Sequence, residues 1–415
     1  MKTRIQISDK VKGELSLLLK YYRKQRNMNQ KDFITYNGAT ICSSDTYSRI
    51  ENQKIIKSHS IYNYLLFQID ACYEFLPSFW ETYHPMFEDL LTAVTRYRLE
   101  EVGALAQEIQ EKLPDSKDIY VKEISILMDV IPYYYENCSE LSDENYEKYL
   151  SLYSVFPEPL QEIIKDMLYT YTVHRRRSAY ECRKIFDKLE METSTCPLNI
   201  LNRSYQYFYE DRFLDCFRDS LYLERLFLED HNYNRLLDVY DAIVLLYTAV
   251  QPQSSIREYD ERLFALVREH MKDLHPNKYK QSLYQCGMML YELRQYREAY
   301  PYFCKLASID DYHYLPAALI ANFIASRLHF TPDAETLKEP KLPERFPSRV
   351  LAFHRYFIQK VNGLSCDDLE TYLVKEVLPL VEKDDKVMWE PLVFELDSLV
   401  KVTKHYYQKK KLIKN

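Results

Sequence analysis

Glycine is scarce in this sequence, with 5 residues among 415, whereas glycine makes up about 7% of an average protein. Nucleotide-binding α/β sheets use several glycines in a single phosphate loop. The chain contains neither a GxGxxG nor a GxxxxGKS/T motif. These absences argue against a Rossmann-type or P-loop enzyme. No Ser/His/Asp or Cys/His pattern stands out either, so we expect a protein that is not an enzyme.

Patterns for metal binding, disulfides and membrane insertion are also missing. The nine cysteines include no CxxC pair and the ten histidines form no HExxH motif, so we expect no metal and no cofactor. An odd number of cysteines suits a reduced protein better than a disulfide framework. The opening MKTRIQISDKVKGEL lacks the apolar stretch of a signal peptide, and the longest apolar run, 242–250, is half a membrane span. We expect a cytoplasmic protein.

Charge of one sign is concentrated at each end of the chain. Residues 1–68 hold 12 Lys and Arg against 5 Asp and Glu, whereas residues 69–400 hold 37 against 57. The last segment, 401–415, holds six lysines and no acid. A basic N-terminal module on an acidic body indicates nucleic-acid contact at one end of the protein. The basic tail could add phosphate contacts or be a solvated end.

The N-terminal module shows apolar residues at helical spacing, interrupted by residues that cap or break helices. The pattern predicts helices over 9–26, 30–35, 44–52 and 60–69, with a turn at 36–40. Asn29 and Ser43 are suited to cap the second and third helices. Tyr47 and Ile50 are expected to point inward from the third helix. The residues expected on its outer face are Ser44, Asp45, Ser48 and Arg49.

This segment resembles the phage-repressor (Xre-type) helix-turn-helix. The resemblance rests on Leu19, Arg23, Asn29, Gln30, Phe33 and Ile34, and on the run Tyr47-Ser48-Arg49-Ile50-Glu51-Asn52. It implies that the third helix enters the major groove of double-stranded DNA, that Gln30 bonds a phosphate, and that Glu51 ties the third helix to the rest. The expected DNA-binding residues are Gln30, Ser43, Ser44, Asp45, Thr46, Ser48, Arg49 and Lys54.

The sequence departs from the family's pattern in three ways. The turn before the third helix carries a few extra residues, near 37–41. Ile34 stands where the family prefers alanine, and Arg49 is the only long donor on the outer face of the third helix. An arginine can pair with guanine O6 and N7, but it can also clamp a phosphate or form an ion pair. A helical module without DNA affinity is the alternative interpretation.

The remainder of the chain reads as consecutive helices, and the fold class we predict is all-α. Prolines mark off helical hairpins of about 30–45 residues, a period typical of α-solenoids. One hairpin, 282–309, resembles a tetratricopeptide repeat through Gly287, Tyr296, Ala299 and Phe303. We expect a right-handed solenoid of degenerate tetratricopeptide-like hairpins. The predicted domains are 1–69 for DNA binding, 70–84 as linker, 85–400 as repeats and 401–415 as basic tail.

A helix-turn-helix followed by such repeats resembles the RNPP family of cytoplasmic peptide-pheromone receptors. The resemblance implies a homodimeric transcription regulator that reads two DNA half-sites and binds a short signalling peptide on the concave face of its repeats. A regulator whose repeats bind a protein partner is the alternative. The sequence leaves open whether the protein represses or activates transcription.

Asparagine side chains can satisfy both the donors and the acceptors of an extended peptide. The first candidate for a peptide clamp is Asn202-Arg203 with Tyr205, and the second is Asn234-Arg235. Other asparagines in or beside predicted helices are Asn199, Asn232 and Asn322. The run 174–177, His-Arg-Arg-Arg, could hold a peptide carboxylate. Capping or surface roles are the alternative for each of these residues.

Overall fold

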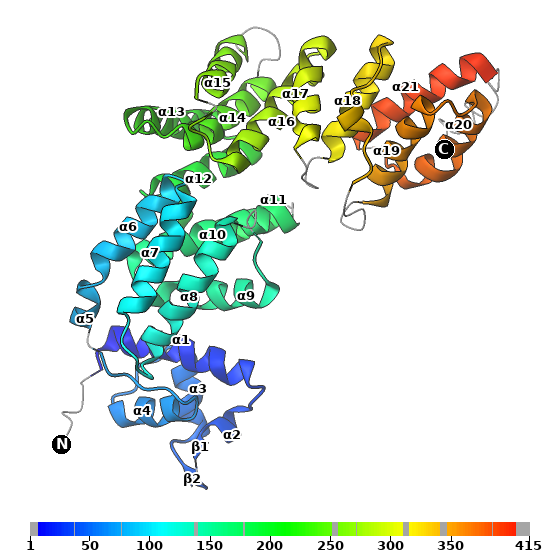
Figure 1. Cartoon of the computed structure of the whole chain (residues 1–415). Helices are drawn as coiled ribbons and strands as arrows, with labels where there is room; N and C mark the ends of the chain where they lie inside the picture. The colour runs from blue at the N-terminus through cyan, green and yellow to red at the C-terminus, as the bar shows by residue number, and fades with distance from the viewer. Residues whose placement is uncertain are drawn as a thin grey trace. The chain divides into compact units, whose positions relative to one another are not determined.

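The computed structural model describes residues 7–36, 38–75, 77–136, 140–176, 179–250, 256–270, 272–309, 315–340, 347–383 and 385–403. Within these residues the chain forms 21 α-helices and one hairpin of two short strands (Figure 1). The all-α prediction is therefore confirmed. The chain divides into two compact units, Met1–Tyr259 and Asp260–Asn415. No helix in the described part of the chain is long and apolar enough to cross a membrane.

The first unit begins with an N-terminal segment, Ile7–Ile69. Its elements are α1 (Asp9–Gln25), α2 (Gln30–Phe33), β1 (Thr35–Tyr36), β2 (Ala39–Thr40), α3 (Ser44–Glu51) and α4 (His59–Phe67). Asn29 and Ser43 cap α2 and α3 as predicted, by accepting the backbone N–H groups of Asp32 at 2.9 Å and Thr46 at 3.2 Å. The prediction that the second helix reaches residue 35 is wrong, because Thr35 pairs with Thr40 across the hairpin.

The rest of the first unit is helical. Its helices are α5 (Pro77–Glu81), α6 (His84–Thr95), α7 (Leu99–Lys112), α8 (Ile119–Glu136), α9 (Asp143–Leu152), α10 (Glu158–Arg176), α11 (Ala179–Lys188), α12 (Pro197–Tyr209), α13 (Phe213–Glu229) and α14 (Tyr233–Val250). One hydrophobic cluster runs from Ile7 to Leu198. The N-terminal segment and the helices that follow it therefore share a core, and the boundary predicted at 69 does not divide the apolar packing.

The segment expected to be a linker, 70–84, is held in place. Asp118 is fully buried, and its carboxylate accepts the backbone N–H groups of Glu74 at 2.7 Å and Tyr120 at 2.8 Å. The backbone of Cys72 pairs with the start of α8 through the N–H of Ile119, at 3.0 Å. Helix α5 lies in this segment and α6 begins in it, so few of its residues are free connecting chain.

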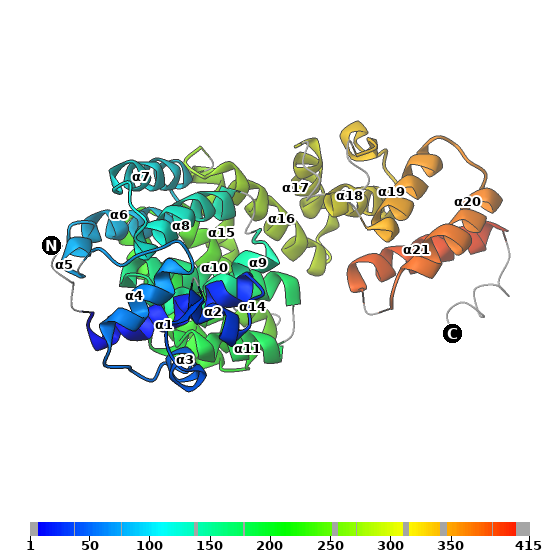
Figure 2. The ribbon, with the colours of Figure 1, turned by 90° about the horizontal axis from the view of Figure 1, so that it is seen from below.

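The packing order of the helices is not a simple succession. Helix α7 packs against α6 and α8 (Figure 2). Helix α10 contacts both α6 and α12, and α12 contacts α13 and α14. Arg235 of α14 donates to the last carbonyls of α6, those of Val94 and Thr95, each at 2.9 Å. Arg96 and Asp230 form a further ion pair of 2.8 Å between the same regions. The helices of the first unit thus return to α6, and a groove lies between them.

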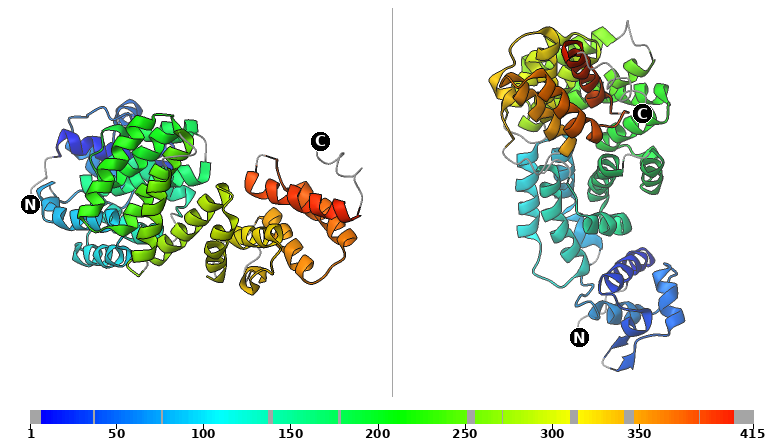
Figure 3. Two further views of the ribbon diagram at one scale, coloured as in Figure 1. Left: turned by 90° about the horizontal axis from the view of Figure 1, so that it is seen from above. Right: turned by 90° about the vertical axis from the view of Figure 1, so that its right-hand side faces the viewer.

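The second unit contains a hairpin that corresponds to the tetratricopeptide-like signature. Its helices, after α15 (Ile256–His270), are α16 (Pro276–Glu292), α17 (Tyr296–Ser308), α18 (Leu315–Leu328), α19 (Ser348–Val361), α20 (Cys366–Tyr372) and α21 (Lys386–Thr403) (Figure 3). A β-carbon on Gly287 would lie 3.0 Å from the ring of Phe303, so this glycine permits the close approach of α16 and α17. A buried carboxylate, Glu395, accepts hydrogen bonds from Tyr356 at 2.6 Å and Lys360 at 2.5 Å.

Candidate nucleic-acid interface and ligand groove

Helix α3 is fixed to α1 and α2 by one buried carboxylate. Glu51, at the end of α3, accepts from the Arg23 guanidinium at 2.5 Å and from the Gln30 amide at 2.6 Å. Arg23 also donates to the carbonyl of Met28 at 2.6 Å. Burial raises the pKa of Glu51, but the hydrogen bonds from Arg23 and Gln30 outweigh it, and the pKa lies below its usual value. Glu51 was expected to tie the third helix to the rest of the segment, and these contacts join α3 to α1 and α2.

The opposite face of α3 is open. Tyr47 and Ile50 are fully buried, as expected, whereas Ser44, Asp45 and Arg49 are exposed. Of the remaining candidates, Ser43 and Lys54 are exposed, and Thr46 and Ser48 are half-buried. The structure therefore brings seven of the eight predicted residues onto α3 and its two ends.

Two cationic side chains on this surface are available to a partner. Arg49 and Lys54 make no hydrogen bond or ion pair through their side chains with the part of the chain that the structure describes. Arginine suits bidentate contacts with a base or a phosphate, and lysine acts as a point charge. Ser43 is different, because its hydroxyl caps α3 and contacts the Thr46 hydroxyl at 2.9 Å.

Gln30 is placed differently from the expectation drawn from the resemblance. Its side chain is half-buried, and its amide nitrogen donates to Glu51 inside the segment. The side chain therefore acts first as a tie between α2 and α3.

Helix α1 also packs against the helical body, through polar contacts that the sequence analysis did not find. The Tyr22 hydroxyl donates to Glu123 of α8, a carboxylate that is 1% exposed and also pairs with Lys148 at 2.8 Å. The Tyr120 hydroxyl donates to Glu14 at 2.6 Å. Burial, together with the charge of Glu123, raises the pKa of Tyr22. These partners lie about a hundred residues apart in the chain, so no local pattern in the sequence indicates that they meet.

The residues predicted to clamp a peptide are engaged within the protein. Asn202 donates to Asp166 at 2.7 Å, and the Tyr205 hydroxyl donates to the carbonyl of Asp238 at 3.0 Å. Arg203 forms an ion pair of 2.7 Å with Asp219 and also bonds two backbone carbonyls. These side chains donate hydrogen bonds, as a peptide clamp would, but the acceptors belong to other helices of the first unit.

The second predicted pair behaves in the same way. Arg235 is 7% exposed and caps α6, as described above, while Asn234 is half-buried and has partners of its own. Asn199 donates to Glu162, and Asn322 bonds Thr336. The side chain of Asn232 caps the start of α14. The side chains of the run 174–177 lie outside the described residues.

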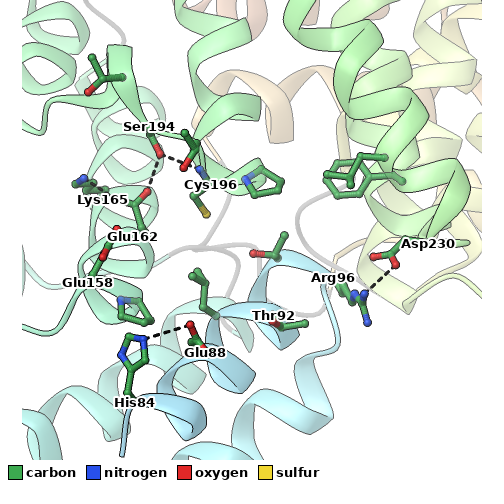
Figure 4. A pocket seen from close by; sticks show the side chains of 18 of the residues that line it. His84, Glu88, Thr92, Arg96, Glu158, Glu162, Lys165, Ser194, Cys196 and Asp230 are labelled. Carbon is green, nitrogen blue, oxygen red and sulfur yellow. Dashed lines mark hydrogen bonds and ion pairs between the residues drawn. The ribbon is translucent and has the colours of Figure 1, made fainter. Parts of the chain in front are cut away.

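A groove of about 590 Å³ lies between α6, α10, α12 and α13 (Figure 4). Its lining contains five carboxylates and two permanent cations, so its charge is net negative. These charged residues are Glu88, Arg96, Glu158, Glu162, Lys165, Glu190 and Asp230. Sequence reasoning missed the groove because its residues come from segments up to 146 positions apart, from His84 to Asp230.

Some charged residues of the groove are held by hydrogen bonds, and others are exposed to solvent. Glu162 is fixed by Lys165 at 2.6 Å and by the Ser194 hydroxyl at 2.7 Å. The Arg96–Asp230 pair is half-exposed and joins the two sides, and Glu158 is exposed. Burial raises the pKa of Cys196 to about 11, so its thiol is not a nucleophile at neutral pH. The groove is thus lined by charged side chains and by side chains that can form hydrogen bonds.

Comparison of the chain with protein-family models, with curated proteins and with solved structures finds no match.

Proposed function

We propose that this protein is a sequence-specific DNA-binding transcription regulator. In this proposal, α2 and α3 form a helix-turn-helix of the Xre type, and α3 enters the major groove of double-stranded DNA. The observation that carries the proposal is that the inner face of α3 is held by buried contacts while its outer face is exposed to solvent. Glu51 ties the helix down, while Ser44, Asp45 and Arg49 are presented to solvent.

The charge of the N-terminal segment supports DNA as the partner. Residues 1–68 carry 12 Lys and Arg against 5 Asp and Glu. Three of the five acids are neutralised within the segment, because Asp9, Glu14 and Glu51 pair with Lys12, Lys10 and Arg23. Phosphate contacts by lysine and arginine release counterions and make binding fall steeply with salt.

The experiment is enrichment of a duplex from a random-sequence pool by the full chain, followed by titration of the enriched duplex. Arg49→Ala should weaken binding by about 1–3 kcal/mol and relax the preference at one base pair. Arg225→Ala is the matched control, because Arg225 is an exposed arginine on α13. Failure to enrich any duplex would refute the proposal. An unchanged preference in the Arg49 variant would remove this residue from base reading.

In this proposal, the helices that follow the N-terminal segment, within residues 85–400, bind a ligand. They form a right-handed solenoid of degenerate tetratricopeptide-like hairpins. The groove at α6, α10, α12 and α13 has a volume within the range of about 300–1,000 Å³ that is usual for ligand sites. Its five carboxylates favour a short peptide with a cationic group over an acidic one. Asn202, Arg203, Tyr205, Asn234 and Arg235 then shape the walls of the body rather than touch the peptide.

The test of the ligand is a titration of the full chain with peptides of about 5–10 residues, the length of a short signalling peptide that the repeats are proposed to bind. The peptides come from the ends of short secreted reading frames that flank the gene. Glu158→Lys in the groove should weaken binding of a cationic peptide, whereas Glu229→Lys, at an exposed position of α13 outside the groove lining, should not. If no peptide binds and a protein partner does, the repeats serve that partner.

A homodimer follows from the same proposal. Two copies would read two half-sites about 34–36 Å apart, which is one turn of the double helix, or a multiple of this spacing. The enriched duplex should then contain an inverted repeat with this spacing. A single half-site bound by one copy would contradict the dimer.

A further inference from the structure

The hairpin β1–β2 lies between the two helices that the proposed function assigns to DNA. Thr35 pairs with Thr40, and Tyr36 pairs with Ala39 in an antiparallel register. Gly38 at the turn has a φ of +78°, a left-handed conformation that suits glycine. Figure 1 shows the two strands projecting beside α2 and α3. The extra residues of the turn have thus become a small structural element.

This hairpin is anchored at its base. The N–H of Ile41 donates to the carbonyl of Ile34 at 2.8 Å. The Gln68 amide, just beyond α4, donates to the carbonyl of Thr35 at 2.6 Å. The Thr35 hydroxyl donates to the carbonyl of Lys31 at 2.9 Å. An isolated two-stranded hairpin is marginally stable in water, so these bonds hold it in one orientation relative to α3.

Both faces of the hairpin are open to solvent. All four strand residues are exposed, and the Tyr36 side chain is 44% exposed. The Tyr36 and Thr40 hydroxyls have no hydrogen-bond partner among the residues that the structure describes. From 33 to 44 the chain contains no charged residue, so this surface neither repels nor attracts a phosphate by net charge.

We infer that the hairpin is a second DNA-contacting element, and that Tyr36 hydrogen-bonds a phosphate beside the groove that α3 enters. This inference rests on the proposed function. Strand β2 runs through Ile41 and Cys42 into the cap of α3. The N-terminal end of a recognition helix is the part that reaches base edges, so the hairpin lies against the adjoining backbone. Tyrosine hydroxyls are common donors to phosphate oxygens and carry no sequence information.

A contact of this kind has a signature that separates it from the contacts of Arg49 and Lys54. A neutral donor releases no counterion, so its loss lowers affinity without changing the slope of affinity against salt. The loss of one lysine–phosphate contact reduces that slope by about 0.9. Tyr36 and Thr40 belong to opposite faces of the hairpin, because neighbouring strand residues alternate. Thr40 therefore tests which face meets the DNA.

The experiment titrates the full chain against the duplex enriched from a random-sequence pool, at several salt concentrations. Tyr36→Phe removes only the hydroxyl, and Lys54→Ala provides the comparison with a charged contact. Tyr36→Phe should weaken binding about tenfold to a hundredfold, in line with a lost hydrogen bond to a charged acceptor, with an unchanged salt slope and base preference. Thr40→Val and Tyr222→Ala, which changes a tyrosine of similar exposure on α13, should bind as the wild type does.

The outcomes distinguish this inference from the proposed function. If the wild type enriches no duplex, the proposed function fails and the hairpin contact fails with it. If the wild type binds and Tyr36→Phe binds equally well, the hairpin contact is refuted while DNA binding stands. A reduced salt slope in Tyr36→Phe, or a loss confined to Thr40→Val, would also overturn the contact. Equal melting temperatures of the variants exclude unfolding as the cause of weaker binding.

Discussion

The buried tie between Arg23 and Glu51 allows a quantitative prediction about how α3 is held. In Glu51→Leu, the Arg23 guanidinium keeps the carbonyl of Met28 but loses its carboxylate, and the Gln30 amide loses its acceptor. Removal of one partner of a buried pair costs about 3–5 kcal/mol. The side chain of Arg23 is 14% exposed, so water can solvate it in part and the lower end of this range applies.

The assay is thermal unfolding of the full chain at neutral pH, followed by hydrogen exchange in α3. In a domain of this size, 1 kcal/mol corresponds to about 2–4 °C, so Glu51→Leu should lower the melting temperature of the first unit by about 6–12 °C. The amides of α3 should lose most of their protection. Duplex binding should fall with the population of ordered α3.

A double variant provides the control. Replacement of both partners by apolar side chains of similar volume is often neutral. Arg23→Met combined with Glu51→Leu should therefore be at least about 2 kcal/mol more stable than the sum of the single changes predicts. Additive single changes, or a shift below 2 °C in Glu51→Leu, would refute the assignment of the tie.

The dependence on pH follows from the same pair. The hydrogen bonds from Arg23 and Gln30 hold the folded-state pKa of Glu51 below its usual value of 4.5. The stability that this carboxylate contributes is therefore fully present above pH 4.5 and is lost as the pH falls through the folded value. The difference between the wild type and Glu51→Leu should shrink below pH 4.5. A difference that stays constant down to pH 2 would contradict this assignment.

Three further predictions concern the helical body. Arg235→Met should destabilise the first unit by about 3 kcal/mol, measured by urea unfolding, because it removes a buried ion pair with Asp238 and leaves two α6 carbonyls without a buried donor; a change below 1 kcal/mol would contradict the capping role. Gly287→Ala should lower the melting temperature despite the higher helix propensity of alanine, because its β-carbon would meet the Phe303 ring at 3.0 Å, and an increase would show that the ring can move. Burial lowers the pKa of His354 from 6.5, so the second unit should lose stability as the pH falls below 6.5 toward the folded value; His354→Phe should remove this dependence, and an unchanged pH profile in that variant would refute it.

Local features were the ones that the sequence could predict. The helix limits in the N-terminal segment agree with the structure to within two residues, because caps such as Asn29 and Ser43 act over three residues. The role of Glu51 was predicted from a motif, and the helical hairpin that contains Gly287 from a repeat signature. Each of these depends on spacing within one or two helices.

Long-range features could not be predicted in the same way. Asn202, Arg203 and Arg235 have side chains that suit a ligand, but each has at least one partner inside the protein that lies between 16 and 141 residues away. The hairpin was expected as a turn, because two-residue strands leave no periodic pattern. The groove depends on the return of α13 and α14 to α6, and no local signal reports such a return.

Helix α1 belongs to two packings at once, which bears on how the protein can be re-engineered. One side of α1 contacts α3 and α4, and another side places Tyr22 and Glu14 against α8. A domain exchange with its boundary after residue 69 would move α1 without the helices of the body that it contacts. It would also remove the hydrogen bond from Tyr22 to Glu123. If the proposed function holds, a change of the recognised DNA sequence is better made by substituting residues on α3 and the hairpin alone, with α1 kept in its native packing.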